Sequence, residues 1–98
     1  MSNETYNGWT NYETWRVNLE MLDGMTPEDF GFQLYNTDAD SLADMVNDLK
    51  MNLEEHVWEI VGQDAKGFAL DLAESFLARV DWEEIAEHMV SDYAAEVA

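Results

Sequence analysis

The stretch from Asp38 to Val61 carries two helical patterns at once, and these constrain the fold more than any other part of the chain. Its apolar residues recur at three- and four-residue steps, which is typical of a helix with one face on a hydrophobic core. They are Leu42, Met45, Val46, Leu49, Leu53, Val57 and Ile60. Its acidic residues form a second stripe at four-residue steps, resumed a turn further on: Asp40, Asp44, Asp48, Glu55 and Glu59. The stretch therefore predicts a long helix over about 40–61, with an apolar face and an acidic face.

The acidic stripe weakens the helix that carries it. Carboxylates four residues apart repel each other and cost a helix roughly 0.2–0.5 kcal/mol per pair. A helix that only had to be soluble would normally place Lys or Arg in this row, but Lys50 is the only basic residue between positions 38 and 61. Two explanations stay open: the acidity serves a binding partner, or it belongs to the environment in which the protein works.

The charge of the whole chain is as unbalanced as that of this stretch. Its 98 residues contain 22 Asp and Glu against four Lys and Arg, for a net charge of −18. Self-repulsion of this size opposes folding, and salt should relieve it. A hydrophobic content of 47%, with four Trp, four Tyr and four Phe, is nevertheless enough for one modest core and argues against disorder.

Several classes of function are disfavoured by what the sequence lacks. Without cysteine the chain cannot use disulfides, thiolate catalysis or Cys-based metal centres. The first residues lack the basic and apolar regions of a signal peptide, and no apolar run reaches membrane-spanning length. We therefore expect a soluble, cytoplasmic protein without membrane contact. Its acidity opposes direct binding to nucleic acid and favours a basic partner.

Helix signals divide the rest of the chain into shorter helices. Residues 1–9 are expected to be loose. The predicted helices cover residues 11–22, 27–35 and 64–79 and the segment that follows Asp81. No window shows the alternation typical of a strand. We therefore predict an all-α fold, a small single-domain bundle of about four to five helices over residues 1–98.

Capping residues set the predicted ends of these helices. The predicted N-terminal signals pair Thr10 with Glu13, Thr26 with Pro27, and Asp81 with Glu84. Asp38 and Asp40 are interpreted as turn and cap residues of the acidic helix. Gly62 stands where a helix commonly ends in a left-handed residue. The apolar residues of the predicted 64–79 helix are Phe68, Leu72, Phe76 and Leu77.

Two segments resemble a known family. Gly8 to Trp15 reads GWTNYETW and is similar to the W-[ST]-N-Y-E-T-W signature that opens a group of small uncharacterised phage, plasmid and prokaryotic proteins. Residues 68–89 resemble the closing pattern of the same group, in which a helix ends before a V-[DN]-W-x-E-I-A motif. The resemblance implies a mobile-element origin and a shared helical fold, and it assigns no activity and no functional residues. Aromatic residues at helical spacing usually pack together, so four of them are expected in the core: Trp9, Tyr12, Trp15 and Trp82.

No cluster in the sequence predicts a catalytic or metal site. Glu84, His88 and Asp92 share a helical face, but one histidine with two carboxylates makes a weak metal site, and such pairings are common on solvated helices. A calcium-loop pattern begins at Asn36 and fails at its sixth position, where Ser41 replaces the glycine. The serines have no recognisable nucleophile setting, and no glycine-rich phosphate loop is present. We predict no enzymatic activity, no cofactor and no metal.

The acidic surface is the feature that remains for function. A rigid row of carboxylates, about 6 Å apart along a helix axis, can enter a cationic channel that normally holds DNA, with charge complementarity and counterion release driving binding. Phages and plasmids use such acidic mimics against restriction enzymes and CRISPR effectors. The sequence therefore favours an anti-CRISPR or anti-restriction inhibitor in the host cytoplasm, which acts by DNA mimicry on the basic DNA-binding channel of a nuclease or CRISPR effector. The predicted contact residues are Asp40, Asp44, Asp48, Glu55 and Glu59, with Glu83, Glu84 and Glu87 as a second ridge.

The alternative is an acidic protein of the halophile type, or an uncharacterised interaction module that does not imitate DNA. Halophilic organisms and their viruses make acidic proteins throughout, for solubility at high salt. The distribution of charge separates the two hypotheses: mimicry predicts one continuous ridge, whereas halophilic adaptation predicts acidity on every face. The sequence leaves open which complex is bound and whether the protein dimerises.

Overall fold

The computed structural model of the protein describes residues 5–33 and 37–97. Within these ranges the backbone forms helices and turns, with no strand and with one isolated antiparallel bridge between Tyr6 and Trp9. The elements in chain order are α1 (Tyr12–Val17), the π-helical turn η1 (Asn18–Leu22), the 3-10 turn η2 (Pro27–Phe30), α2 (Ala39–Asp64), α3 (Phe68–Leu77) and α4 (Trp82–Val97). The predicted all-α fold is confirmed.

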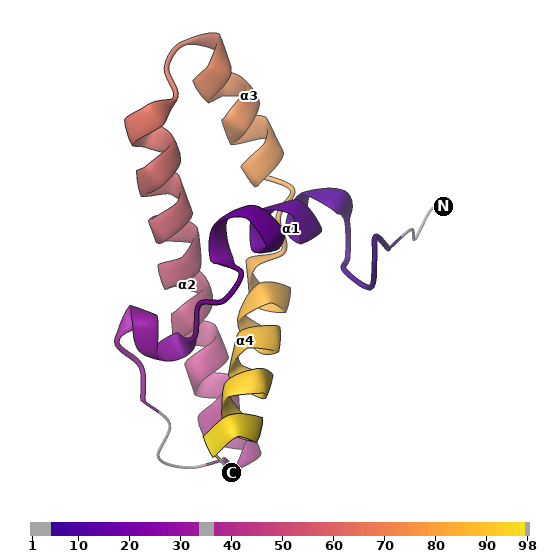
Figure 1. Cartoon of the computed structure of the whole chain (residues 1–98), viewed down its shortest axis with the longest axis vertical. Coiled ribbons are helices and arrows are strands. Elements are labelled where there is room, and N and C mark those ends of the chain that lie inside the picture. Colours follow the sequence, from indigo (N-terminus) through magenta and orange to yellow (C-terminus); the bar gives the residue numbers. More distant parts are fainter. Residues whose placement is uncertain (1–4, 34–36, 98) are drawn as a thin grey trace.

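The long helix α2 is the element against which the others are arranged. Figure 1 shows α2 along one side of the molecule, with α3 and then α4 following one another back along it in the opposite direction. The most extensive helix–helix contact lies between α2 and α4. The short α1 crosses the joint between α3 and α4. The fold is therefore a helical hairpin whose second arm is broken, with α1 lying over the break.

The core lies mainly between α2 and α4. Leu49, Leu53 and Val57 of α2 are fully buried, as is Ile85 of α4, and all belong to one hydrophobic cluster. The other members of the predicted apolar stripe are buried or half-buried: Leu42, Met45, Val46 and Ile60. Each fully buried side chain of this size contributes about 1.5–3 kcal/mol of transfer free energy. The predicted apolar face of the acidic helix is confirmed.

Aspartates cap both long helices. The Asp38 carboxylate accepts hydrogen bonds from the backbone N–H of Ser41 at 2.9 Å and from its hydroxyl at 3.0 Å, so α2 begins one residue earlier than predicted. The Glu84 N–H donates to Asp81 Oδ1 at 3.0 Å, which confirms the predicted start of α4. Each cap satisfies a backbone donor that the first turn of a helix leaves without an intrahelical partner.

The end of α2 differs from the prediction. Gly62 lies inside α2 and does not end it in a left-handed conformation. Between α2 and α3 the positive φ occurs instead at Gly67, at 61°, directly before α3. The predicted helix over 64–79 is therefore shorter, at Phe68–Leu77. A glycine costs a helix interior only about 1 kcal/mol, and α2 continues past Gly62 to Asp64.

The start of α1 also differs, because Asn11 caps the helix in place of Thr10. Asn11 Oδ1 accepts the Thr14 N–H at 2.9 Å. The Thr10 N–H instead donates to the Glu84 carboxylate at 2.9 Å, 74 residues away. Glu13, the other half of the predicted capping box, forms an ion pair with the joint between α3 and α4. Tertiary contacts therefore decide which residue caps this helix.

The predicted helix over 11–22 reaches Leu22 but changes type, and the predicted helix over 27–35 is shorter. The first widens after Val17 into the π-helical turn η1. The second is the four-residue η2, which has the predicted start at Thr26 and ends at Gly31, where φ is 89°. Parts of two other predictions, the loose segment 1–9 and the turn 36–38, together with the end of the 27–35 helix, fall on residues 1–4 and 34–36 and lie outside the described residues.

Candidate functional site

The predicted acidic ridge lies on one face of α2, and we call it the α2 ridge. Its members are Asp40, Asp44, Asp48, Glu55 and Glu59, all exposed. At 3.6 residues per turn they fall within an arc of about 100°, on the side of α2 opposite the buried stripe. From Asp40 to Glu59 the ridge spans about 28 Å at 1.5 Å per residue. A single uninterrupted helix of 26 residues carries it.

The charge density of the α2 ridge is lower than that of DNA. Its carboxylates follow one another at about 7 Å on average along the axis, whereas one phosphate occurs every 3.4 Å along one strand. The stripe is interrupted at Asn52, whose side-chain amide donates to the Asp48 carbonyl at 2.9 Å. The ridge therefore offers roughly half the linear charge of a single strand.

The sole basic residue of α2 does not neutralise the ridge. Lys50 Nζ lies 3.2 Å from Glu83 Oε1 of α4. Both side chains are partly exposed, so the pair adds little stability, of the order of 0–1 kcal/mol. The pair matters more for the surface charge than for stability. It directs the positive charge of Lys50 towards α4, so Lys50 does not offset the negative charge of the α2 ridge.

The members of the predicted second ridge on α4 make different contacts. Glu83 faces Lys50 of α2, and Glu87 borders a shallow hollow that also contains Val46 of α2. Glu84 lies on the α1 side, half-buried, where its carboxylate accepts the Thr10 N–H. Glu83 and Glu84 are therefore engaged in contacts within the fold, and the contact of Glu84 is structural.

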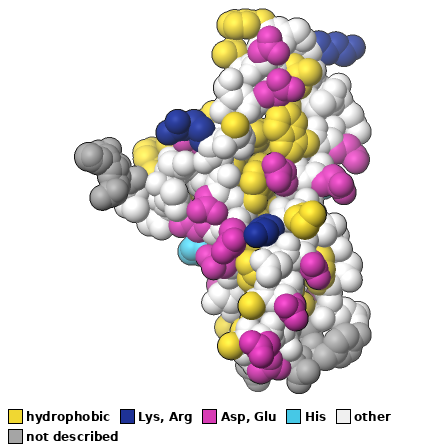
Figure 2. Space-filling model, turned by 180° about the vertical axis from the view of Figure 1, so that it is seen from behind, with side chains coloured by type: hydrophobic (Ala, Val, Ile, Leu, Met, Phe, Trp, Pro, Cys, Tyr) yellow, Lys and Arg dark blue, Asp and Glu magenta, His cyan; other side chains and the backbone are white. Residues whose placement is uncertain are grey.

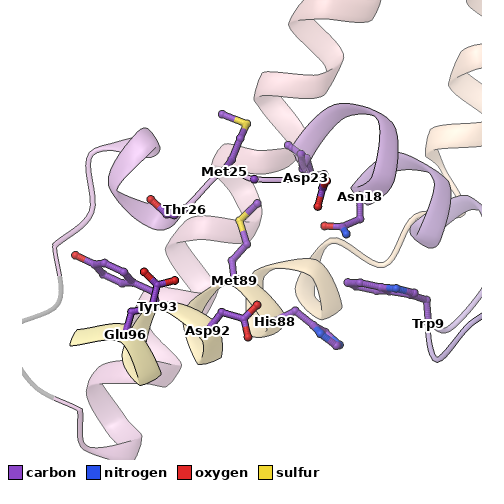
Figure 3. A pocket seen from close by; sticks show the side chains of 12 residues that line it. Trp9, Asn18, Asp23, Met25, Thr26, His88, Met89, Asp92, Tyr93 and Glu96 are labelled. Carbon is purple, nitrogen blue, oxygen red and sulfur yellow. The ribbon is translucent and has the colours of Figure 1, made fainter. Parts of the chain in front are cut away.

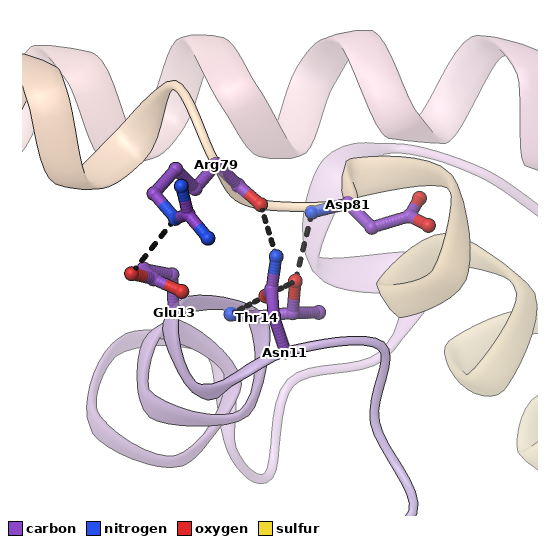
Figure 4. Close-up of polar contacts among 5 residues, drawn as sticks. All are labelled: Asn11, Glu13, Thr14, Arg79 and Asp81. Atoms are coloured by element: carbon purple, nitrogen blue, oxygen red, sulfur yellow. Dashed lines mark hydrogen bonds and ion pairs between the residues drawn. The ribbon is translucent and has the colours of Figure 1, made fainter. Parts of the chain in front are cut away.

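The joint between α3 and α4 is held by α1 (Figure 4). The side-chain amide of Asn11 donates to the Arg79 carbonyl at 2.7 Å, and the Thr14 hydroxyl accepts the Asp81 N–H at 2.9 Å. Arg79 Nε lies 3.1 Å from Glu13 Oε2. These residues come from the two segments that carry the family resemblance. The two motifs therefore form one structural unit, and their polar residues hold the fold together at this point.

The aromatic residues of the motifs only partly enter the core. Trp9 and Trp82 are half-buried and pack against the core cluster. Tyr12 is 37% exposed, and with Trp15 and Tyr6 it forms a ring cluster at the surface, with centroids 4.8–5.7 Å apart. The expectation that all four lie in the core is therefore wrong for Tyr12 and Trp15. Short α1 presents these two rings to the N-terminal segment instead.

A cavity of about 260 Å³ lies between α4 and the segment that follows η1 (Figure 3). Its walls are Trp9, Met25 and Met89, with carboxylates from Asp23 and Asp92.

Two of the residues that the sequence analysis set aside as a weak metal site, His88 and Asp92, line this cavity. The His88 ring lies against Trp9 at a centroid distance of 4.2 Å, and Glu84 is engaged by Thr10. In residues 5–33 and 37–97, no three His, Asp or Glu side chains are grouped as metal ligands.

The helix α3 is covered only sparsely by the rest of the fold. Of its ten residues, all of them described, only Leu77 is buried, whereas Phe68 is 76% and Leu72 is 56% exposed. Beside it, a groove of about 460 Å³ is bounded by α1, η1 and the end of α2, and we call it the α3 groove. Its apolar walls are Val17, Met21, Val61, Leu72, Ala73 and Phe76. The sequence indicates this apolar stripe but not its exposure, because a core face and a docking face have the same helical period.

Two charged groups have pKa values shifted by local hydrogen bonds. The backbone N–H and then the hydroxyl of Ser41 lower the pKa of the Asp38 carboxyl. The Tyr12 hydroxyl, followed by Glu20, raises the pKa of the Arg16 guanidinium. Both groups serve local structure: Asp38 caps α2, and Arg16 ties two residues of its own helix together.

Figure 2 shows that acidic side chains are spread along the whole length of the face opposite Figure 1, between patches of hydrophobic side chains. Acidic residues also occur on α1, η1, η2, α3 and α4. The α2 ridge is thus one acidic row on a surface that is acidic on several sides.

Comparison with known proteins identifies a family. Among the helices of the described residues, none is long and apolar enough to cross a membrane. No curated protein and no solved structure matches the chain. A family model for DUF7249, a family of unknown function, matches residues 2–97. This match spans both motif segments and the acidic helix between them, so the chain belongs to the DUF7249 family.

Proposed function

We propose that the protein inhibits a host defence complex by occupying its DNA-binding channel. In this proposal a phage or another mobile element supplies the protein as an anti-CRISPR or anti-restriction factor, and it acts in the host cytoplasm without catalysis. The observation that supports it best is the α2 ridge, a row of five exposed carboxylates about 28 Å long on a single helix.

The physical basis of the proposal is charge complementarity. A channel that holds DNA presents Lys and Arg at the spacing of phosphates. The α2 ridge offers carboxylates at about half that density, so it would engage a subset of these residues. Association would be fast and would weaken as salt rises, because long-range attraction between exposed charges is screened within about 8–10 Å at physiological salt.

The halophile-type alternative also has an observation in its favour. Carboxylates are exposed on α3 at Asp71 and Glu74 and on η2 at Glu28 and Asp29, as well as on α2. Acidity on several faces is what adaptation to high salt predicts. The same distribution also suits an interaction module that does not imitate DNA. The experiment must therefore test the position of the charge, and not only its amount.

A competition assay with two charge-matched variants makes this test. Restriction and CRISPR effector complexes carrying labelled target DNA are titrated with the protein at moderate salt. The first variant is Asp44→Lys with Asp48→Lys, on the α2 ridge. The second is Asp71→Lys with Glu74→Lys, on α3, which changes the net charge equally. Circular dichroism establishes that both variants are folded.

The proposal predicts that the natural protein and the α3 variant displace DNA from one of the complexes, whereas the α2 variant does so at least tenfold less well. It also predicts that displacement weakens with added salt. Equal loss in both variants would mean that total charge and not the ridge matters. Failure of the natural protein to bind any complex would favour the halophile-type alternative.

A further inference from the structure

The α3 helix is too apolar for its exposure. Its sequence, FALDLAESFL, contains five large apolar residues, yet only Leu77 is buried among its ten residues. Phe68, Leu72 and Phe76 follow one another at four-residue steps, so they lie along one side of the helix. Monomeric proteins rarely leave contiguous apolar surface open unless it binds something.

The α3 groove extends this apolar stripe inwards. Leu72 and Phe76 form one wall, Val17 and Met21 form the opposite wall, and Val61 from the end of α2 lines it as well. The volume of about 460 Å³ is enough for two or three large apolar side chains. Such a slot suits anchors at positions i, i+3 and i+4 of a helix from another protein.

The charges around the α3 groove select the kind of partner. The two charged residues that line it, Arg16 and Glu20, are paired with each other at 2.7 Å, so the slot itself is neutral. On α2, the exposed carboxylates of Glu54 and Asp64 lie within about 60° of Val61 around the helix, on the side that lines the groove. A second copy of the chain would bring a net charge of −18 against an equal charge, and this repulsion opposes a homodimer.

We propose that the α3 groove binds an amphipathic helix of a partner protein, with apolar residues on one face and Lys or Arg on the other. The apolar residues of the partner helix would fill the α3 groove, and its basic residues would meet the carboxylates on the borders of the groove. This contact goes beyond DNA mimicry: it uses another surface and another chemistry, and it holds whether or not the partner binds DNA.

Three synthetic helical peptides test the proposal with the full chain. The first carries Leu at i, i+3, i+4 and i+7 with Lys elsewhere. The second has the same charge with Ser in place of Leu, and the third keeps Leu but has Glu in place of Lys. Titration of isotope-labelled protein, followed by amide chemical shifts, reports both affinity and position. We expect only the Leu/Lys peptide to bind at micromolar concentration, with shifts at Val17, Leu72 and Phe76.

Two variants keep the test specific. Leu72→Ser removes a wall of the groove at an exposed position, and it should weaken Leu/Lys peptide binding by about tenfold or more, since an apolar anchor is lost. Met51→Ser removes an apolar side chain that is 67% exposed on α2, outside the groove, and should leave affinity within about twofold.

Four results would overturn the proposal: equal binding of the Ser/Lys peptide, binding of the Leu/Glu peptide, shifts confined to the α2 ridge, or equal losses in both variants. Sedimentation of the protein alone adds a fifth. A dimer of the natural chain that Leu72→Ser abolishes would identify a second copy as the occupant. Because the α2 ridge takes no part in this assay, the proposal and the DNA-mimic function can fail separately.

Discussion

Replacing Thr14 by valine removes one hydroxyl from the joint between α3 and α4 while keeping nearly the same shape. Thr14 is fully buried. Its hydroxyl accepts the Asp81 N–H at 2.9 Å and donates to Asn11 Oδ1 at 2.6 Å. The backbone N–H of Thr14 still reaches Asn11 in the variant, because that bond does not involve the hydroxyl. The variant therefore leaves the Asp81 N–H without its acceptor and removes the hydrogen bond from the Thr14 hydroxyl to Asn11 Oδ1.

The expected loss follows from the cost of an unsatisfied donor. The hydrogen bond between the Asp81 N–H and the Thr14 hydroxyl is part-buried, so water replaces the lost acceptor only in part. Leaving a buried donor unpaired costs about 1–3 kcal/mol. For a domain of this size each kcal/mol lowers Tm by roughly 4–8 °C. Thr14→Ser is the matched control, since it keeps the hydroxyl and loses one methyl group, worth about 0.8 kcal/mol.

Thermal and urea unfolding followed by circular dichroism measure both variants at one fixed salt concentration. Amide hydrogen exchange adds a local measurement, because protection of the Asp81 N–H should fall in Thr14→Val and persist in Thr14→Ser. The reasoning is refuted if Thr14→Val is as stable as the natural protein, or if its Asp81 amide stays protected. In either case α1 would hold the joint by packing alone.

Further predictions concern the caps, the glycines, the core and the net charge. Gly67→Ala should destabilise the protein by about 1–3 kcal/mol, because its φ of 61° disfavours a side chain. Gly62→Ala should instead stabilise α2 by up to about 1 kcal/mol, since nothing lies within 4 Å of an added Cβ. Urea unfolding measures the free energy of unfolding of both variants. Leu53→Ala should cost about 2–5 kcal/mol in the same assay, because Leu53 is fully buried. The pKa of Asp38 is lowered in the folded state, so its stabilising contribution is complete above the ordinary range of an aspartate and is lost as the pH falls through the lowered value. Asp38→Asn keeps a cap without this titration, and a pH series of unfolding curves should show a shallower acid loss than in the natural protein. Added NaCl should raise the Tm of the natural protein, since a net charge of −18 opposes folding at low ionic strength.

Local patterns in the sequence were sufficient for the two long helices. The period of the apolar residues between Leu42 and Ile60 places one face of α2 on the core, and the aspartate caps at 38 and 81 start α2 and α4. These features depend on residues within one or two turns of each other, so sequence spacing alone reveals them. The exposure of the α2 ridge follows from the same period.

Features that depend on distant residues were not predictable in this way. Thr10 has the residues of a cap, yet its N–H is drawn to Glu84, and Asn11 caps α1 while also reaching the Arg79 carbonyl. The same contact takes Glu84 out of the predicted second ridge. Each of these outcomes joins residues about 70 positions apart, and no local propensity encodes such a contact.

The helix α3 shows most clearly what the helical period of a sequence cannot predict. Its sequence alone determined that Phe68, Leu72 and Phe76 share one side of a helix, because 3.6 residues per turn place them there. Only the tertiary structure decided that this side is exposed at Phe68 and Leu72 and half-buried at Phe76, because α1 lies across the joint at residues 78–81. Helical period measures how apolar a face is, but whether that face becomes core or docking surface depends on which other elements reach it.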